Sequence, residues 1–494
     1  MASFERRGPR TLNGTSERGV DRPFAWDAGV LSKDVAFTLA AFVAALLPRL
    51  FVAIAWAKEP VWDGHYYHFG AERIARGLGY SEDVLSHGLL LWKPWVHYPV
   101  GYSAVLGFFY RIFGAELVVA PVVNAVTGAL LVAVVHRVAR YYLSRDRARV
   151  AAGLCALHPG LIVYSAVVMS EPLAALLLVG AALLALHYRG RWQAIAYAGA
   201  FLGMATLVRP ASLLAAPLLI FTQPKPLWQA AARAAAACAV ALLVVLPWTL
   251  RNCQRLDGCA LVSTNGGWNL AIGAITESGR FQTLRAADGC PIVTGQVQQD
   301  RCWGEVGRKK IAAAPLRWLS LAPLKLSQTF DHESFAIEYL HEADPDSWPE
   351  ARRVAARELL TAFHRLLLVI AALAVVGLPR WDARVRPAFF TQLALGALVL
   401  GVACYAALDD AHPFYWLAVL TPLLAALPVP GRPAQGAAGG YLLSLLAVTA
   451  LTHVVFFGED RYHLVVTPLL CMLAAAALRA QDTVTAPSLS ANSR

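Results

Sequence analysis

The sequence predicts an all-α polytopic membrane protein with about 12 transmembrane helices, several interfacial helices and a small extracytoplasmic domain. Of the 494 residues, 57% are hydrophobic and only 15% are charged, whereas about a quarter of the residues are charged in a typical soluble domain. Apolar runs of about 20 residues, the length that crosses a bilayer, recur along the chain. These runs are too long and too rich in Ala and Leu for the alternating strands of a membrane β-barrel.

The apolar runs divide the chain into modules. We expect a disordered cytoplasmic tail at 1–34, a transmembrane module at 35–250 with its first outer loop at 58–116, an extracytoplasmic domain at 251–357, a second transmembrane module at 358–480, and a cytoplasmic tail at 481–494. The candidate spans lie near 35–57, 117–143, 148–168, 171–188, 192–207, 210–222, 229–250, 358–379, 387–407, 411–428, 438–457 and 462–480.

Basic residues in the short connections set the orientation, because cytoplasmic loops carry an excess of Lys and Arg. With both termini inside, the basic loops fall inside as well: Arg145, Arg147, Arg149, Arg189, Arg191, Lys225, Arg380, Arg384, Arg386 and Arg432. This alternation requires that 99–114 does not cross the membrane. The net charge of +11 is therefore explained by topology and anionic lipid, and we expect no nucleic-acid partner.

The cysteines fit this topology. Cys155, Cys238, Cys404 and Cys471 lie inside predicted spans, where cysteine behaves as a small apolar residue. The other four lie together in 251–357, which favours two disulfides in an oxidising compartment, with three possible connectivities. They are Cys253, Cys259, Cys290 and Cys302. A zinc site is the alternative, but no paired C-x-x-C spacing supports it.

Two acidic residues stand out on the predicted outer face. Asp63 follows the first span among aromatic residues; it is either part of an interfacial aromatic loop or a general base whose pKa is raised by partial desolvation. Glu171 lies in a tight turn between two apolar runs, where an acid is costly unless it meets water or a partner. Alternatively, Ser170 caps the following helix and the negative charge of Glu171 interacts favourably with the dipole of that helix.

Three arginines have no role in topology. Arg49 lies inside the first span and Arg209 interrupts a later apolar stretch, so each either snorkels or binds a buried anion. Arg461 opens the last span from outside. The polar, glycine-rich stretch 263–274, which contains Asn265, is either a turn or a substrate-lining loop.

No metal-ligand spacing is evident. A metal could bind to His65, His68, His97 and His412, but no tight spacing of His and Asp supports this, and interfacial packing is the favoured interpretation. A divalent cation is left open as a cofactor.

Several motifs, in this order along residues 35–480, resemble the GT-C superfamily of integral-membrane glycosyltransferases. The branch they resemble contains the dolichyl-phosphate-mannose–protein mannosyltransferases and the lipid A aminoarabinose transferase. The motifs are Arg49 in the first span, WDGHYYHFGAERIARGLGYSE, HYPVGYSAVLGFFYRIFG, HPGLIVYSAVVMSEP, LVRP, LPWTLRN with STNGGWNLAIGA, and FGEDRYHLVVTPLL.

The resemblance implies a bacterial inner-membrane enzyme that moves a sugar from a polyprenyl-phosphate donor to an extracytoplasmic lipid, glycan or protein acceptor. It implies that Asp63 is the catalytic acid–base residue and Glu171 a second acid near the reaction centre, both within 35–250. Protein mannosyltransferases usually carry a second acid beside the first, and this chain has Gly64 there, which disfavours protein as the acceptor. The candidate substrate-binding residues are Arg49, His65, Tyr66, Tyr98, Tyr102, Arg209, Asn265 and Arg461.

Two other classes of function remain as alternatives. A transporter or flippase would show polar or broken helices near the bilayer midplane, whereas here the polar residues gather at one face. A non-catalytic envelope protein would not need Asp63 and Glu171 where they lie. Nucleotide-sugar enzymes with nucleotide-binding folds are excluded because no G-x-G-x-x-G or P-loop pattern follows a predicted strand.

Overall fold

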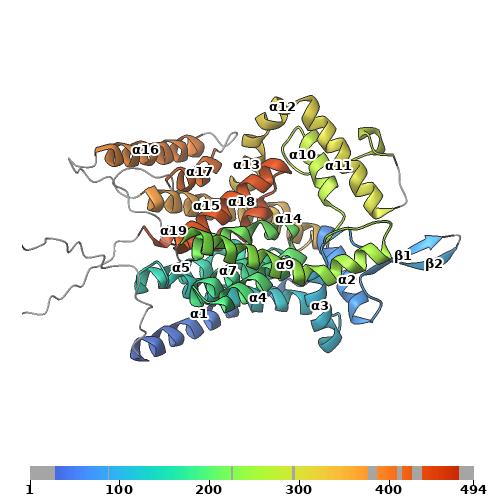
Figure 1. The fold of residues 1–494 in the computed structure, drawn as a ribbon, viewed down its shortest axis with the longest axis horizontal. Helices are drawn as coiled ribbons and strands as arrows, with labels where there is room; N and C mark the ends of the chain where they lie inside the picture. The colour runs from blue at the N-terminus through green and yellow to red at the C-terminus, as the bar shows by residue number, and fades with distance from the viewer. Residues whose placement is uncertain are drawn as a thin grey trace, which may run out of the picture.

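The computed structural model describes residues 28–86, 88–223, 226–291, 295–376, 386–408, 414–425 and 437–477. Within these ranges the protein is helical apart from one antiparallel hairpin, β1 (Ser81–Ser86) and β2 (Leu89–Pro94), in which Ser81 pairs with Pro94. The helices run mostly along the long axis of the molecule (Figure 1). The predicted all-α polytopic membrane fold is confirmed.

The first half of the chain forms a bundle with the outer loop attached to one end. Its elements are α1 (Ala28–Ala55), α2 (Trp62–Ala75), the hairpin, α3 (Val100–Phe113), α4 (Val119–Ala139), α5 (Arg145–Leu157), α6 (Pro159–Val163), α7 (Glu171–His187), α8 (Trp192–Val208), the 3₁₀ helices η1 (Pro210–Ala215) and η2 (Pro217–Thr222), and α9 (Leu227–Arg255).

The second half begins with short helices and ends with the second group of long ones. Its elements are α10 (Gly266–Ile275), η3 (Ala286–Asp288), α11 (Gln296–Ala313), α12 (Pro315–Ser320), α13 (Ala322–Phe330), α14 (Phe335–Ala343), α15 (Glu350–Val376), α16 (Arg386–Leu408), α17 (Trp416–Ala425), α18 (Ala437–Val455), η4 (Asp460–Val465) and α19 (Thr467–Ala475).

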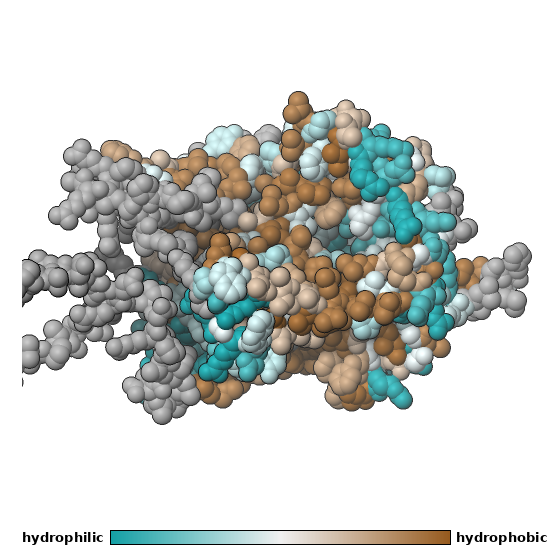
Figure 2. Space-filling view, viewed as in Figure 1, coloured by the Kyte–Doolittle hydropathy of each residue, from teal (hydrophilic) through white to brown (hydrophobic). Residues whose placement is uncertain are grey.

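Four described helical segments are long and apolar enough to cross a bilayer by themselves: 33–55, 119–139, 227–255 and 350–376. The core lies around α7, which is buried at most of its positions, as expected for a helix that is apolar on all sides. Figure 2 shows hydrophobic residues over the middle of the visible face and hydrophilic residues at the end that carries α11.

Three predicted spans differ from the structure, and proline explains each difference. The run 148–168 breaks between α5 and α6 at Pro159, and the run 210–222 forms two 3₁₀ helices that begin at Pro210 and Pro217. The run 462–480 splits into η4 and the short α19, with Pro468 in the first turn of α19. Proline lacks the N–H that would continue the preceding helix but fits the first turn of a new one.

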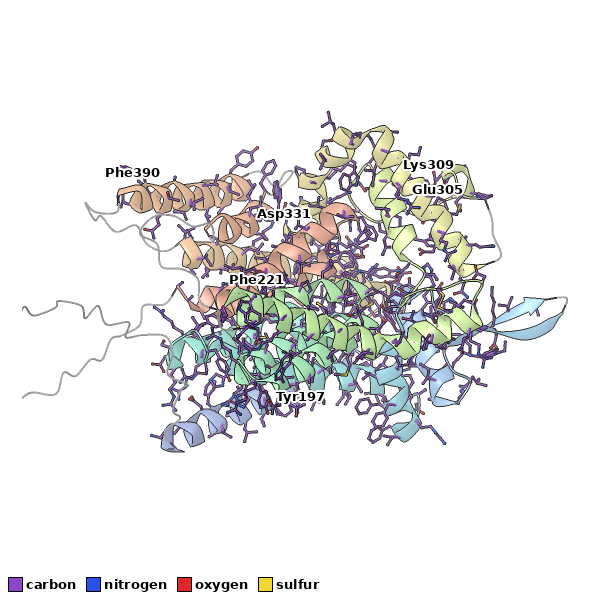
Figure 3. The ribbon with its side chains drawn as sticks, viewed as in Figure 1. Tyr197, Phe221, Glu305, Lys309, Asp331 and Phe390 are labelled. Atoms are coloured by element: carbon purple, nitrogen blue, oxygen red, sulfur yellow. A yellow bond between two sulfur atoms is a disulfide. The ribbon has the colours of Figure 1, made fainter. Side chains whose placement is uncertain are left out.

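The hairpin, α10 and α11, which belong to the predicted outer segments, lie toward one end of the molecule, at the right in Figure 1. The disulfides Cys253–Cys259 and Cys290–Cys302 are both present in 251–357, which confirms the disulfide prediction and fixes the connectivity. On α11, Glu305 and Lys309 form an exposed ion pair of 2.8 Å (Figure 3).

Some predictions fall outside the described residues. These are the terminal tails up to residue 27 and from residue 478, the basic loop residues Lys225, Arg380, Arg384 and Arg432, and His412.

Candidate active site

Asp63 lies in the first turn of α2, where the helix dipole favours an acidic side chain. The preceding residue, Trp62, has a φ of 50°, which a bulky side chain seldom adopts. Its ring packs on Phe335 and Tyr339, at centroid distances of 5.5 and 6.0 Å. Contacts with α14 therefore hold the start of α2, and with it Asp63, in a fixed place.

Gly64 is required by close packing. A Cβ atom at this position would overlap the Tyr339 hydroxyl and lie 3.0 Å from the carbonyl oxygen of Val168. A second acid beside Asp63 therefore does not fit, which gives a physical reason for the departure from the mannosyltransferase pattern.

Both oxygens of the Asp63 carboxylate accept a hydrogen bond. Tyr98 Oη donates to Oδ1 at 2.6 Å, and Arg461 Nη1 donates to Oδ2 at 2.6 Å. Burial alone would raise the pKa of Asp63, but the Arg461 charge and these two donors outweigh it and hold the pKa below its ordinary value. The raised pKa expected from the sequence is wrong, because that reasoning counted the burial and not the arginine.

Arg461 is the centre of a group of charged and aromatic side chains. Besides Asp63 it contacts Glu459, with 2.6 Å between Nε and Oε2, and its guanidinium lies 4.9 Å from the Phe335 ring centroid and 5.0 Å from that of Tyr462. Burial raises the pKa of Glu459, with Arg461 opposing it. An arginine between two carboxylates holds its planar head in one orientation.

Glu171 begins α7 and is fully buried, and its partner is Arg209, which follows α8. Arg209 Nη1 donates to Glu171 Oε1 at 2.7 Å, and the guanidinium lies 5.2 Å from the Tyr462 ring. The Ser170 side chain makes no cap hydrogen bond, so the alternative in which it caps α7 is not realised. The acid in the tight turn therefore meets a cation, and the two arginines share one aromatic neighbour.

These groups line a cavity of about 860 Å³. Much of its wall is apolar: Leu445, Val448, Leu451 and Val455 follow one face of α18 at helical spacing, and Leu178 and Leu214 face it from other helices. Six of the candidate residues named from the sequence line it: Asp63, Glu171, Tyr98, Arg209, Asn265 and Arg461.

The other four candidates do not line the cavity. His65 and Tyr66 lie on the outer face of α2, where Tyr66 is 45% exposed and stacks on Tyr98. Tyr102 is buried and donates to Asn124 at 3.0 Å, which makes it a packing residue of α3 and α4.

The prediction that Arg49 binds the substrate phosphate is wrong. It is fully buried, and its guanidinium donates to the backbone carbonyls of Ala45, Cys155 and Ala156 at 2.9–3.0 Å. The carbonyls at the end of α5 have no partner within their own helix. Arg49 therefore joins α1 to α5 and is not available to an anion in the cavity.

Several features of the site were not predicted from the sequence: the contacts of Glu459 and Tyr462 with Arg461, the position of His97 in the cavity wall, and the ion pair between Glu171 and Arg209. Glu459 and Tyr462 stand in the quoted motif GEDRYH but were not assigned a role, although two acids beside Arg461 were a visible signal. His97 lines the cavity and packs edge-on against Trp268 at 5.6 Å, as its packing interpretation predicts. Nothing in the sequence indicated that Glu171 pairs with Arg209.

Residues 97–250 match the family model of dolichyl-phosphate-mannose-protein mannosyltransferase. This match confirms the resemblance to GT-C glycosyltransferases. The matched segment contains Tyr98, Glu171 and Arg209, whereas Asp63 and Arg461 lie outside it. The search of curated proteins found no match.

The solved structures that are similar to this chain include an archaeal oligosaccharyltransferase and ArnT. The oligosaccharyltransferase AglB from Archaeoglobus fulgidus, in complex with an inhibitory peptide and a dolichol-phosphate, is 15% identical with a TM-score of 0.41, over 89% of this chain and 50% of that one. ArnT from Cupriavidus metallidurans in the apo state is 16% identical with a TM-score of 0.33, over 91% of this chain and 77% of that one. The chain thus spans about half the length of the oligosaccharyltransferase.

Proposed function

We propose that this protein is a membrane glycosyltransferase that moves a sugar from a polyprenyl-phosphate-linked donor to an extracytoplasmic acceptor, which is a lipid, a glycan or a protein. The observation that carries the proposal is the composition of the cavity. One wall is formed by α18 and is largely apolar, and the remaining wall carries two arginines and two carboxylates. An isoprenoid phosphate has the same division into an apolar chain and an anionic head.

Arg209 and Arg461 are the proposed phosphate-binding residues. Each is bound to a carboxylate, Arg209 to Glu171 and Arg461 to Asp63, so the charges of the arginines are compensated within the site. A guanidinium offers five donors in a fixed fork, so it can keep one carboxylate and still bind a phosphate oxygen. The negative charge that develops on the departing phosphate oxygen is stabilised by these cations.

Asp63 is the proposed general base. The proton of the acceptor hydroxyl or amine passes to an Asp63 oxygen, the acceptor atom bonds to the anomeric carbon, and the bond from that carbon to the phosphate oxygen breaks. The electron pair leaves with the polyprenyl phosphate. When the donor phosphate binds beside Arg461, its negative charge raises the pKa of Asp63, which makes the carboxylate a better proton acceptor in the complex than in the free protein.

We place the reaction on the extracytoplasmic side of the bacterial inner membrane. The predicted orientation puts α2, η4 and the disulfide-bonded segment on that side, and disulfides form in an oxidising compartment. The membrane itself is thus a partner, because it delivers the donor by its lipid chain.

The proposal is tested by carrier binding to purified Arg461→Lys. Lysine keeps the charge but presents a single point donor, so we expect the Kd for a polyprenyl phosphate in detergent to rise by about tenfold. Arg255→Lys is the matched control, because Arg255 is exposed at the end of α9 and lies outside the cavity lining. Equal Kd values for both variants and the wild type would remove Arg461 from the binding site.

A further inference from the structure

A second polar cluster lies in the core and does not line the cavity of the proposed active site. It consists of Glu333 from the link between α13 and α14, His158 from the start of α6, His364 from α15, and His463 from η4. All four side chains are at most 3% exposed. Asp331, labelled near the middle of the molecule in Figure 3, marks the link that carries Glu333.

The three imidazoles face one carboxylate oxygen. The distances to Glu333 Oε2 are 4.0 Å from His158 Nε2, 4.0 Å from His364 Nδ1 and 3.8 Å from His463 Nε2. These are too long for hydrogen bonds. Accordingly, five buried polar atoms of the cluster have no hydrogen-bond partner: the three imidazole nitrogens just named and both Glu333 oxygens. Buried polar atoms in a native fold are normally satisfied, so this set needs a partner.

The protonation of two histidines is fixed by their outer contacts. His364 Nε2 lies 2.9 Å from the carbonyl oxygen of Phe330, and His463 Nδ1 lies 2.8 Å from that of Thr329. A carbonyl only accepts, so these two nitrogens carry the protons. In the neutral tautomers the opposite nitrogens, which face Glu333, present lone pairs. A ligating histidine typically donates its other N–H to a carbonyl in this way.

We propose that Glu333, His364, His463 and His158 bind one Zn²⁺ ion. Histidine nitrogen and carboxylate oxygen suit zinc, and a closed set of four protein ligands is the arrangement of structural zinc sites. Tetrahedral zinc with bonds of about 2.0–2.1 Å places its ligand atoms roughly 3.3 Å apart. The ligand atoms of His158, Glu333 and His364 lie within 4.8 Å of one another, and His463 Nε2 lies 3.8 Å from Glu333 Oε2, so the four side chains move closer together on binding.

His158 changes most when the ion binds. Its Nδ1 now accepts from the Leu161 amide at 3.3 Å, so Nε2 carries the proton. Ligation through Nε2 moves that proton to Nδ1 and gives up this long hydrogen bond. The neighbouring Gly160 leaves room for the carboxylate, because a Cβ atom there would overlap Glu333 Oε1.

A bound ion would link segments that lie far apart in the sequence. Asp460, in η4, accepts hydrogen bonds from the amides of Ser334 and Phe335, the latter at 2.7 Å, directly after Glu333. An ion bound by Glu333 and His463 would add a second link between η4 and the segment that connects α13 to α14. Since η4 also carries Arg461, the ion would be a positioning element for the proposed active site without touching its cavity.

The test measures bound metal and is independent of any transfer activity. The full chain is purified in detergent by an affinity tag that uses no metal, and its zinc content is measured by mass spectrometry. We expect about one zinc per chain. Glu333→Gln and His364→Gln should each fall below about a fifth of that value, because each removes one ligand. His136→Gln is the matched control: His136 is also fully buried, and it contacts Thr38 in a different part of the core.

A second measurement covers variants that fail to fold. Wild-type protein produced in zinc-depleted medium should have a lower Tm than protein supplied with Zn²⁺, and Mg²⁺ should not replace it. Full zinc content in both ligand variants would overturn the proposal. So would a metal-free wild type whose Tm does not change with Zn²⁺, which would leave a proton shared between Glu333 and the histidines as the account of the cluster.

Discussion

At the scale of single residues, Asp63 depends on two partners that lie far away in the sequence. Arg461 is 398 residues distant and Tyr98 is 35 residues distant, and each donates to one oxygen of the carboxylate. The composition of the chain made Asp63 conspicuous, because an acid beside a membrane span is unusual. Its charge state could not be predicted, since burial and a nearby cation shift the pKa in opposite directions and only the distances decide between them.

The pH dependence of transfer follows from this arrangement. In the free protein the pKa of Asp63 is below its ordinary value of 3.8, so the carboxylate stays ionised as the pH falls from 7 to about 5. We therefore expect kcat/KM, which reports the free enzyme, to be flat on the acid side over this range. The acid limb of kcat should lie at higher pH, because the bound phosphate raises the pKa of Asp63.

The measurement is a pair of pH profiles with a phosphodiester-linked donor, which does not itself titrate in this range. A fall of kcat/KM with a midpoint above about pH 5.5 would mean that the base is a group with a raised pKa, and not Asp63 as it lies here.

At the scale of elements, apolar length predicted the helices but proline decided how they end. The run 171–188 became one helix, α7, because no proline interrupts it beyond its first turn. The run 148–168 did not form a single helix, because His158 and Pro159 interrupt it. The side chain of His158 lies in the core at this interruption. The β1–β2 hairpin was not predicted, since its strands lie in a loop with no clear alternation of apolar and polar residues.

The disulfides give a prediction for the segment between α9 and α11. Four of the eight cysteines are paired, and the other four are free thiols: Cys155, Cys238, Cys404 and Cys471. Unfolded in detergent without reductant, the protein should react with four equivalents of a maleimide reagent, and with eight after reduction. Labelling of all eight without reductant would show that the segment does not reside in an oxidising compartment.

At the scale of the whole molecule, the groups that form the candidate site come from both halves of the chain. Asp63 comes from α2 and Arg461 from η4, and residues of η1 form part of the cavity wall. The apolar residues of α18 form another part of the wall. The hairpin and α11, both in predicted outer segments, lie toward the same end of the molecule (Figure 1). The orientation itself remains a prediction.

Reporter fusions test that orientation. A reporter joined after Arg149 should be active only as a cytoplasmic reporter, and one joined near Gly289 only as an extracytoplasmic reporter. The reason is that Arg145 and its neighbours form a basic cluster at the start of α5, whereas Gly289 precedes a disulfide cysteine. If both fusions report the same side, the topology and the proposed side of the reaction are wrong.

The most direct test of the account is the turnover of Asp63→Asn. Asparagine keeps the shape of the side chain and its oxygen can still accept from Tyr98 or Arg461, but it cannot take a proton from the acceptor. We expect turnover in proteoliposomes to fall by roughly a hundredfold or more, the usual size for loss of a general base, with carrier binding within a few-fold of the wild type. Full transfer activity in Asp63→Asn would contradict the account and leave Asp63 as a structural partner of Arg461.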